Sequence, residues 1–87
     1  MFNFAHGIPA VVKSLKAVAI GMGFDVSAFY SEKQIAISSE NWNILADFAE
    51  NYICSTKVNE PTVLKICCSP EEVEHEYLHI LQGIVAL

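Results

Sequence analysis

The segment His75-Glu76-Tyr77-Leu78-His79 carries side chains that could do metal chemistry. On a helix, histidines four residues apart share one face, so both imidazoles can reach the same cation. The intervening Glu76 would then act as a general base toward a metal-bound water. The spacing therefore offers one interpretation in which His75 and His79 are metal ligands, zinc is the cofactor and Glu76 is the catalytic residue of a zinc-dependent hydrolase; outside this interpretation no cofactor is expected.

This segment resembles the zinc-binding helix of the zincin metalloproteases. The resemblance covers five of the 87 residues and implies metal-dependent hydrolysis. A catalytic zinc normally has three protein ligands and a bound water. None of the eight residues after His79 is a His, Cys, Asp or Glu, so the third ligand would come from upstream or from another subunit. The upstream candidates are His6, Asp25, Cys67 and Cys68.

The same pattern also fits a solvated helix face. Glu71 and Glu72 lie four and three residues before His75, and such pairs stabilise an exposed helix by about 0.2–0.5 kcal/mol each. Exposed histidine pairs at this spacing also bind divalent metals without catalysis, including a metal shared by two protomers. We expect the solvated face, and metal binding or zinc-dependent hydrolysis is the alternative. Outside that alternative we assign no catalytic residue.

The composition indicates a folded chain with more apolar side chains than one small body can bury. Hydrophobic residues make up 53% of the 87 residues and charged residues 17%, whereas soluble domains carry about 25% charged residues. This composition excludes intrinsic disorder, which needs low hydrophobicity and high net charge. The length predicts a single domain over residues 1–87. Because a domain of this size buries only ~60–65% of its surface, part of the apolar surplus should lie on an interface.

The charges and cysteines limit the partners and the compartment. The chain has five lysines, no arginine and ten acidic residues, for a net charge of −5, and phosphate recognition needs clustered Lys and Arg. We therefore expect no nucleic acid and, without an apolar run of about 18–20 residues, no membrane. The three cysteines are odd in number and two are adjacent. Free thiols and a cytoplasmic location are therefore expected of Cys54, Cys67 and Cys68.

Hydrophobic periodicity predicts three helices and three strands. Between residues 40 and 54, for example, apolar side chains recur at helical spacing at Trp42, Leu45, Ala46, Ala49, Tyr52 and Ile53. The predicted elements are a helix at about 8–22, strands at about 24–30 and 34–38, a helix at about 40–54, a strand at about 62–68 and a helix at about 70–83. These elements predict an α+β fold: a single two-layer domain in the order α-β-β-α-β-α, with a small three-stranded sheet and helices packed mainly on one face.

Together these features predict a small acidic protein–protein interaction module. It would act by binding, as an adaptor, an inhibitor or an immunity-type protein does, and not by catalysis. We expect a homo-oligomer, most simply a dimer, and/or a protein partner. The last helix and the residues after it are the predicted shared surface, because little chain remains to cover them. The interface candidates are Ile84, Val85, Leu87 and an exposed Trp42.

Overall fold

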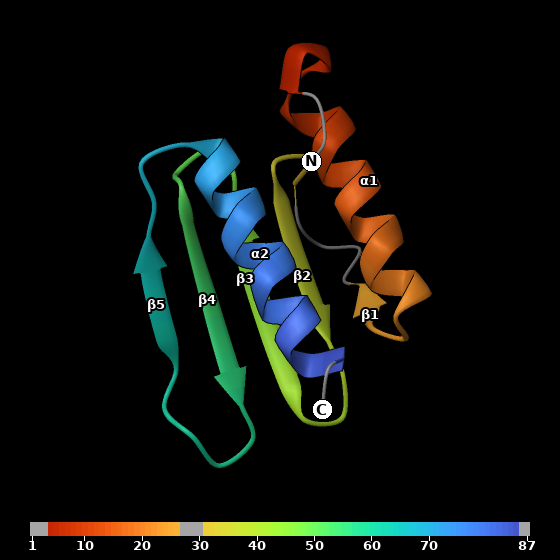
Figure 1. Ribbon diagram of the computed structural model, residues 1–87, viewed down its shortest axis with the longest axis vertical. Helices are drawn as coiled ribbons and strands as arrows, with labels where there is room; N and C mark the ends of the chain where they lie inside the picture. Colours follow the sequence, from red (N-terminus) through yellow and green to blue (C-terminus); the bar gives the residue numbers. More distant parts are fainter. Residues whose placement is uncertain (1–3, 27–30, 86–87) are drawn as a thin grey trace.

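In the part of the chain that the structure describes, two helices lie on one face of a five-stranded antiparallel sheet, forming a two-layer α+β fold (Figure 1). The computed structural model describes residues 4–26 and 31–85, without the side chain of residue 85. The strands lie side by side in their sequence order. In chain order the elements are a 3-10 helix η1 (Phe4–His6), α1 (Ile8–Gly21), β1 (Asp25–Val26), β2 (Gln34–Ser38), β3 (Trp42–Asp47), β4 (Tyr52–Lys57), β5 (Val63–Ile66) and α2 (Pro70–Val85).

Helix α1 corresponds to the helix predicted over 8–22. Pro9 lies in its first turn, where backbone N–H groups have no intrahelical acceptor, so the lack of an N–H in proline costs no hydrogen bond. At its end, the N–H of Gly23 donates to the Ile20 carbonyl and the N–H of Phe24 donates to the Ala19 carbonyl, both at 3.0 Å. Gly23 has a φ of 92°, so this is a Schellman motif that stops the helix. The residues that α1 buries are Val11, Val12, Leu15 and Ala19.

Helix α2 begins with side-chain caps from Ser69 and Glu72 and extends to Val85, past the expected end at 83. The Ser69 hydroxyl accepts the N–H of Glu72 at 3.2 Å, and the Glu72 carboxylate accepts the N–H of Cys68 at 2.6 Å. These bonds satisfy donors that a helix start leaves without partners. Val73, Tyr77 and Leu81 form the buried stripe of α2. No helix within residues 4–26 and 31–85 has the length and hydrophobicity that a membrane crossing requires.

The register of the sheet separates a covered face from an open one. Ile37 pairs with Ile44, and Ile35 with Ala46, which pairs in turn with Ile53. These residues are buried in one core cluster with the stripes of both helices. Alternate residues point to the opposite face, where no described helix lies (Figure 1). There the register lines up a row of apolar side chains across four strands, namely Ala36, Leu45, Cys54 and Leu64.

The helix predicted over 40–54 is wrong: this segment forms the hairpin of β3 and β4, so the described sheet has five strands and not three. The turn is built around Asp47, whose carboxylate oxygen Oδ1 accepts the N–H groups of Ala49 and Glu50 at 2.9 and 2.8 Å. Asn51 completes it with a φ of 59°, a conformation that Asn tolerates better than most residues. Ser39 lies in the turn before β3, where its N–H donates to the Trp42 carbonyl.

The remaining predicted strands correspond to strands of the structure. The strand predicted over 34–38 is β2, and the strand predicted over 62–68 is the shorter β5. The strand predicted over 24–30 begins in β1, and its residues 27–30 lie outside the described residues. The core therefore combines the two terminal helices with a meander of neighbouring strands, whose outer members are β1 and β5.

Candidate functional site

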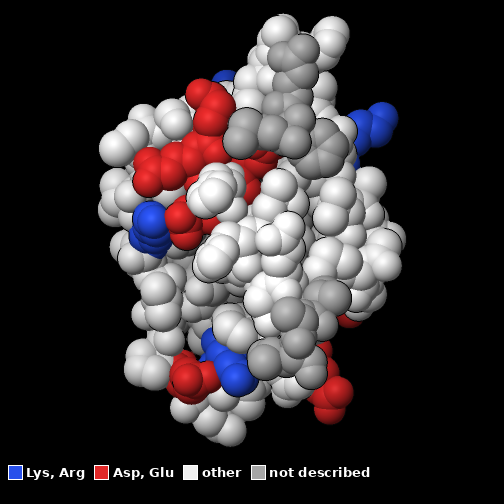
Figure 2. All heavy atoms as spheres, viewed as in Figure 1, with Lys and Arg blue, Asp and Glu red and all other residues white. Residues whose placement is uncertain are grey.

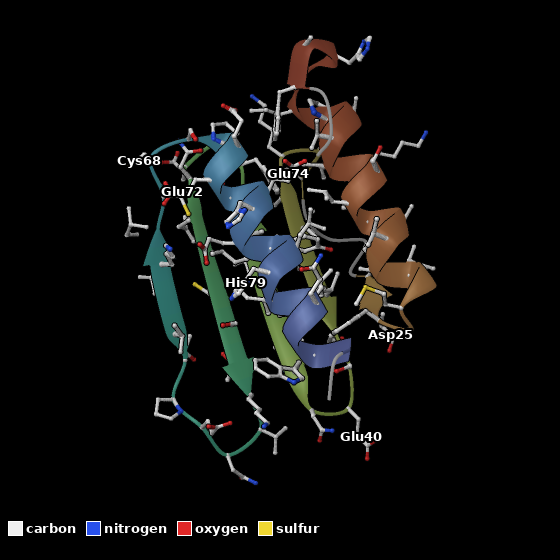
Figure 3. All side chains as sticks on the ribbon, in the orientation of Figure 1. Asp25, Glu40, Cys68, Glu72, Glu74 and His79 are labelled. Carbon is white, nitrogen blue, oxygen red and sulfur yellow. The ribbon has the colours of Figure 1, made fainter. Side chains whose placement is uncertain are left out.

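The two predicted metal ligands lie together on the exposed side of α2. His75 and His79 are both exposed, and their rings stack with an interplanar angle of 11° and a centroid separation of 6.5 Å. They line a shallow hollow of about 250 Å³ together with Glu74, Leu78 and Gln82. Figure 3 labels His79 halfway along α2. The four-residue spacing therefore brings the imidazoles together as the sequence predicts.

Glu76, the predicted general base, is bonded to the edge of the sheet. Its Oε1 accepts a hydrogen bond from the Lys65 ammonium of β5 at 2.8 Å. This hydrogen bond lowers the pKa of Glu76 below its usual value and raises that of Lys65. A carboxylate whose pKa is lowered is a weaker base. The geometry of Glu76 thus opposes the role that the zincin resemblance implies and favours an ion pair between helix and sheet.

The upstream candidates for a third zinc ligand do not join the histidine pair. Within residues 4–26 and 31–85, no group of three or more His, Cys, Asp or Glu side chains could hold a metal ion. His6 lies in η1. Asp25 lies in β1 and lines a hollow on the open face of the sheet, whereas His79 lies on α2, which covers the opposite face (Figure 3). Cys67 is buried and Cys68 exposed in the link between β5 and α2. Burial raises the pKa of the Cys67 thiol, which makes it a poorer metal ligand at neutral pH.

The structure describes two of the four predicted interface side chains, Trp42 and Ile84. Trp42 and Ile84 are partly buried and pack against the core cluster. The Lys57 ammonium lies 5.9 Å from the centre of the Trp42 ring, over its face. Val85 ends α2, and Leu87 lies outside the described residues. Trp42 and Ile84 are thus partly exposed beside the core, and their role in an interface stays a prediction.

The most exposed apolar surface of the described residues is the edge strand β5. Val63, Leu64 and Ile66 are exposed by 63, 57 and 69%. Strand β5 pairs with β4 on one side and is the last strand of the sheet on the other. Helix α2 lies over β3 and β4, so β5 extends past the helical layer (Figure 1). Sequence reasoning missed this site because a short apolar run has the same pattern whether the strand is central or at the edge.

Two further features of the surface lie outside this edge. Acidic side chains gather over the first turns of α2, as Figure 2 shows, and include Glu71, Glu72 and Glu76. The open sheet face carries a second shallow hollow, of about 400 Å³. Its lining mixes apolar and polar side chains, including Ala36, Leu45, Cys54, Asp25, Asn43 and Thr56.

No protein-family model, no curated protein and no solved structure matches this chain. Its function therefore has to be argued from these surfaces alone.

Proposed function

We propose that this protein is a small interaction module that acts by binding, and that it forms a homodimer through the edge of β5. The observation that carries the proposal is the exposed apolar edge of Val63, Leu64 and Ile66. An outer strand offers unpaired N–H and C=O groups to another chain, and soluble proteins usually protect such an edge with charge, proline or a covering segment. In β5 only Lys65 is charged. Pairing with a second strand would satisfy both the backbone and the apolar side chains.

A second copy is the occupant because the edge is self-complementary. Two antiparallel strands related by a two-fold axis keep corresponding faces of their sheets on the same side, so opposed residues must belong to the same face. Leu64 and Ile66 belong to the open face, since they pair with Cys54 and Tyr52. Lys65 belongs to the helical face, where it reaches Glu76. Symmetric pairs centred on Leu64 or Lys65, the two middle residues of β5, oppose the most residues of the strand.

The register centred on Leu64 is the favourable one. Centring on Lys65 places two ammonium groups directly opposite each other, which destabilises a strand pair. Centring on Leu64 places leucine against leucine, and Val63 of each copy against Lys65 of the other. The apolar row that ends at Leu64 then continues into the second copy. The described strands of the two copies would then form one sheet of ten strands, five from each copy, with the described helices of both copies on the same face.

The oligomeric state in solution tests this proposal. We expect light scattering or sedimentation to give the mass of a dimer, about twice 9.6 kDa. In Leu64→Lys, two buried leucines are lost at the axis, at ~1.5 kcal/mol or more each, so the dimer should weaken by about a hundredfold. The matched control is Ile20→Lys, which changes an equally exposed apolar residue on α1 and should leave the dimer intact.

Two results would overturn the proposal. If the wild-type chain stays monomeric at high concentration, the β5 edge does not pair with a second copy and the proposal is wrong. A dimer that Leu64→Lys leaves intact, but Ile20→Lys dissociates, would place the interface on α1. The proposal also includes a reducing, cytoplasmic compartment, which the three free thiols of Cys54, Cys67 and Cys68 support.

A further inference from the structure

The exposed side of α2 carries a second possible binding site, separate from the β5 edge. We propose that His75 and His79 form a two-ligand chelate for a divalent transition-metal cation. The site is non-catalytic and holds one cation in each chain. Water completes the coordination shell on the exposed side. This inference does not depend on the dimer, because the imidazoles lie on a helix and the dimer edge lies on a strand.

The geometry of the ring pair supports the chelate. The two rings are nearly parallel, with an interplanar angle of 11°, and their centroids lie 6.5 Å apart. Two nitrogens that share a cation lie about 4 Å apart or less, because each bond is about 2.0–2.1 Å long. Both side chains are exposed, so each can rotate toward the other without displacing the core. The helix backbone already holds the two ligands in register.

The surroundings also favour a cation. The hollow beside the rings is lined by Glu74 and Gln82 as well as by the histidines. Helix α2 carries four glutamates, at 71, 72, 74 and 76, and no lysine or arginine. Lys65 of β5 contacts this helix, and its ammonium group forms an ion pair with Glu76. The field at the imidazoles is therefore that of an acidic helix, which attracts cations.

The identity of the cation follows from the ligand chemistry. Imidazole nitrogen suits copper, nickel and zinc, whose affinities for such sites rank with Cu²⁺ above Ni²⁺ and Zn²⁺. Magnesium and calcium require oxygen ligands and several of them. We therefore expect the site to bind Cu²⁺ most tightly and Ni²⁺ and Zn²⁺ more weakly. We expect no binding of Mg²⁺ or Ca²⁺.

Calorimetric titration of the untagged full chain with NiCl₂ tests the proposal. The titration uses a Cys68→Ser background, which removes the one exposed thiol among the described cysteines. One Ni²⁺ should bind each chain. His75→Ala or His79→Ala should weaken binding by about a hundredfold, because each removes the second arm of a bidentate ligand. His6→Ala changes an exposed histidine of η1 and should bind as the parent chain does.

A spacing control separates chelation from the mere presence of histidines. The double variant His75→Ala/Glu71→His keeps the number of histidines but places two of them eight residues, or about 12 Å, apart on the helix. It should bind as weakly as His75→Ala. Circular dichroism establishes that each variant is folded. The proposal is overturned if the parent chain binds no Ni²⁺, or if the spacing control or His75→Ala binds as tightly as the parent.

Discussion

Replacing Tyr77 with phenylalanine tests how the two helices are joined. Tyr77 is fully buried, and its hydroxyl donates a hydrogen bond of 3.1 Å to the main-chain carbonyl of Leu15 in α1. Tyr77→Phe keeps the ring, so the packing is retained and only this bond is lost. A buried hydrogen bond between neutral groups contributes ~1 kcal/mol to the free energy of unfolding. For a domain of this size, that loss lowers Tm by about 4–8 °C.

The same variant should change the response to alkaline pH. Burial raises the pKa of Tyr77 above its ordinary value, because the tyrosinate would be desolvated. A raised pKa in the folded state stabilises the fold below the pKa of an unfolded tyrosine, about 10. That contribution is lost as the pH rises above this value toward the folded pKa. The free energy of unfolding of wild type should therefore fall more steeply above pH 10 than that of Tyr77→Phe. The difference in free energy of unfolding between the two chains should narrow as the pH rises.

Urea denaturation followed by circular dichroism measures both effects, at one protein concentration because the proposed dimer would contribute to stability. Tyr77→Ala is the contrasting variant, since it also removes the ring and should cost about 3–5 kcal/mol. A Tyr77→Phe chain as stable as wild type at pH 7 would refute the role of the hydrogen bond. A difference between the two chains that is the same at pH 8 and pH 11 would refute the account of the raised pKa.

Three further predictions concern the turns and the ion pair. Asp47→Ala removes the carboxylate that organises the hairpin and accepts the Gln34 amide at 2.7 Å, so urea denaturation should show a loss of about 3 kcal/mol. Gly23→Ala places a side chain at a φ of 92° and should cost about 1–2 kcal/mol in the same assay. Because Lys65 lowers the pKa of Glu76, the pair stabilises the fold above the unfolded pKa of Glu, and this contribution is lost as pH falls through the lowered pKa. Wild type and Lys65→Met should therefore converge in Tm on acidification, and a gap that persists at pH 2 would contradict this.

The two terminal helices could be predicted because their signals are local. In α1, an apolar stripe, a proline in the first turn and a glycine after the last turn all act within the helix itself. In α2, Ser69 and Glu72 make their capping bonds within one turn. The His75–His79 pair could be predicted for the same reason, since its geometry follows from the helix alone. Each of these features is independent of the remainder of the chain.

The hairpin of β3 and β4 could not be predicted because both of its faces carry apolar residues. Ile44 and Ala46 face the helices, while Leu45 faces the open side. A strand that is apolar on both faces loses its two-residue alternation, and its pattern then also fits a helix. The deciding interactions are the turn at Asp47 and the pairing with β2, and the pairing depends on residues outside the segment. The ion pair between Lys65 and Glu76, 11 residues apart, is hidden for the same reason.

The hairpin also accounts for where the apolar surplus lies. With a third helix in place of β3 and β4, a small sheet would have been largely covered, and the surplus would have gathered at the C-terminal end of the chain. In the described residues, two helices lie on five strands, and one sheet face and the β5 edge remain outside the helical layer. The proposed strand addition at Leu64 would cover the edge, whereas the histidines of α2 belong to the other layer. Dimerisation and metal binding should therefore be independent: Leu64→Lys should keep the Ni²⁺ affinity of wild type, and His75→Ala should keep the mass of the dimer. Loss of both properties in either variant would mean that the cation bridges the two copies.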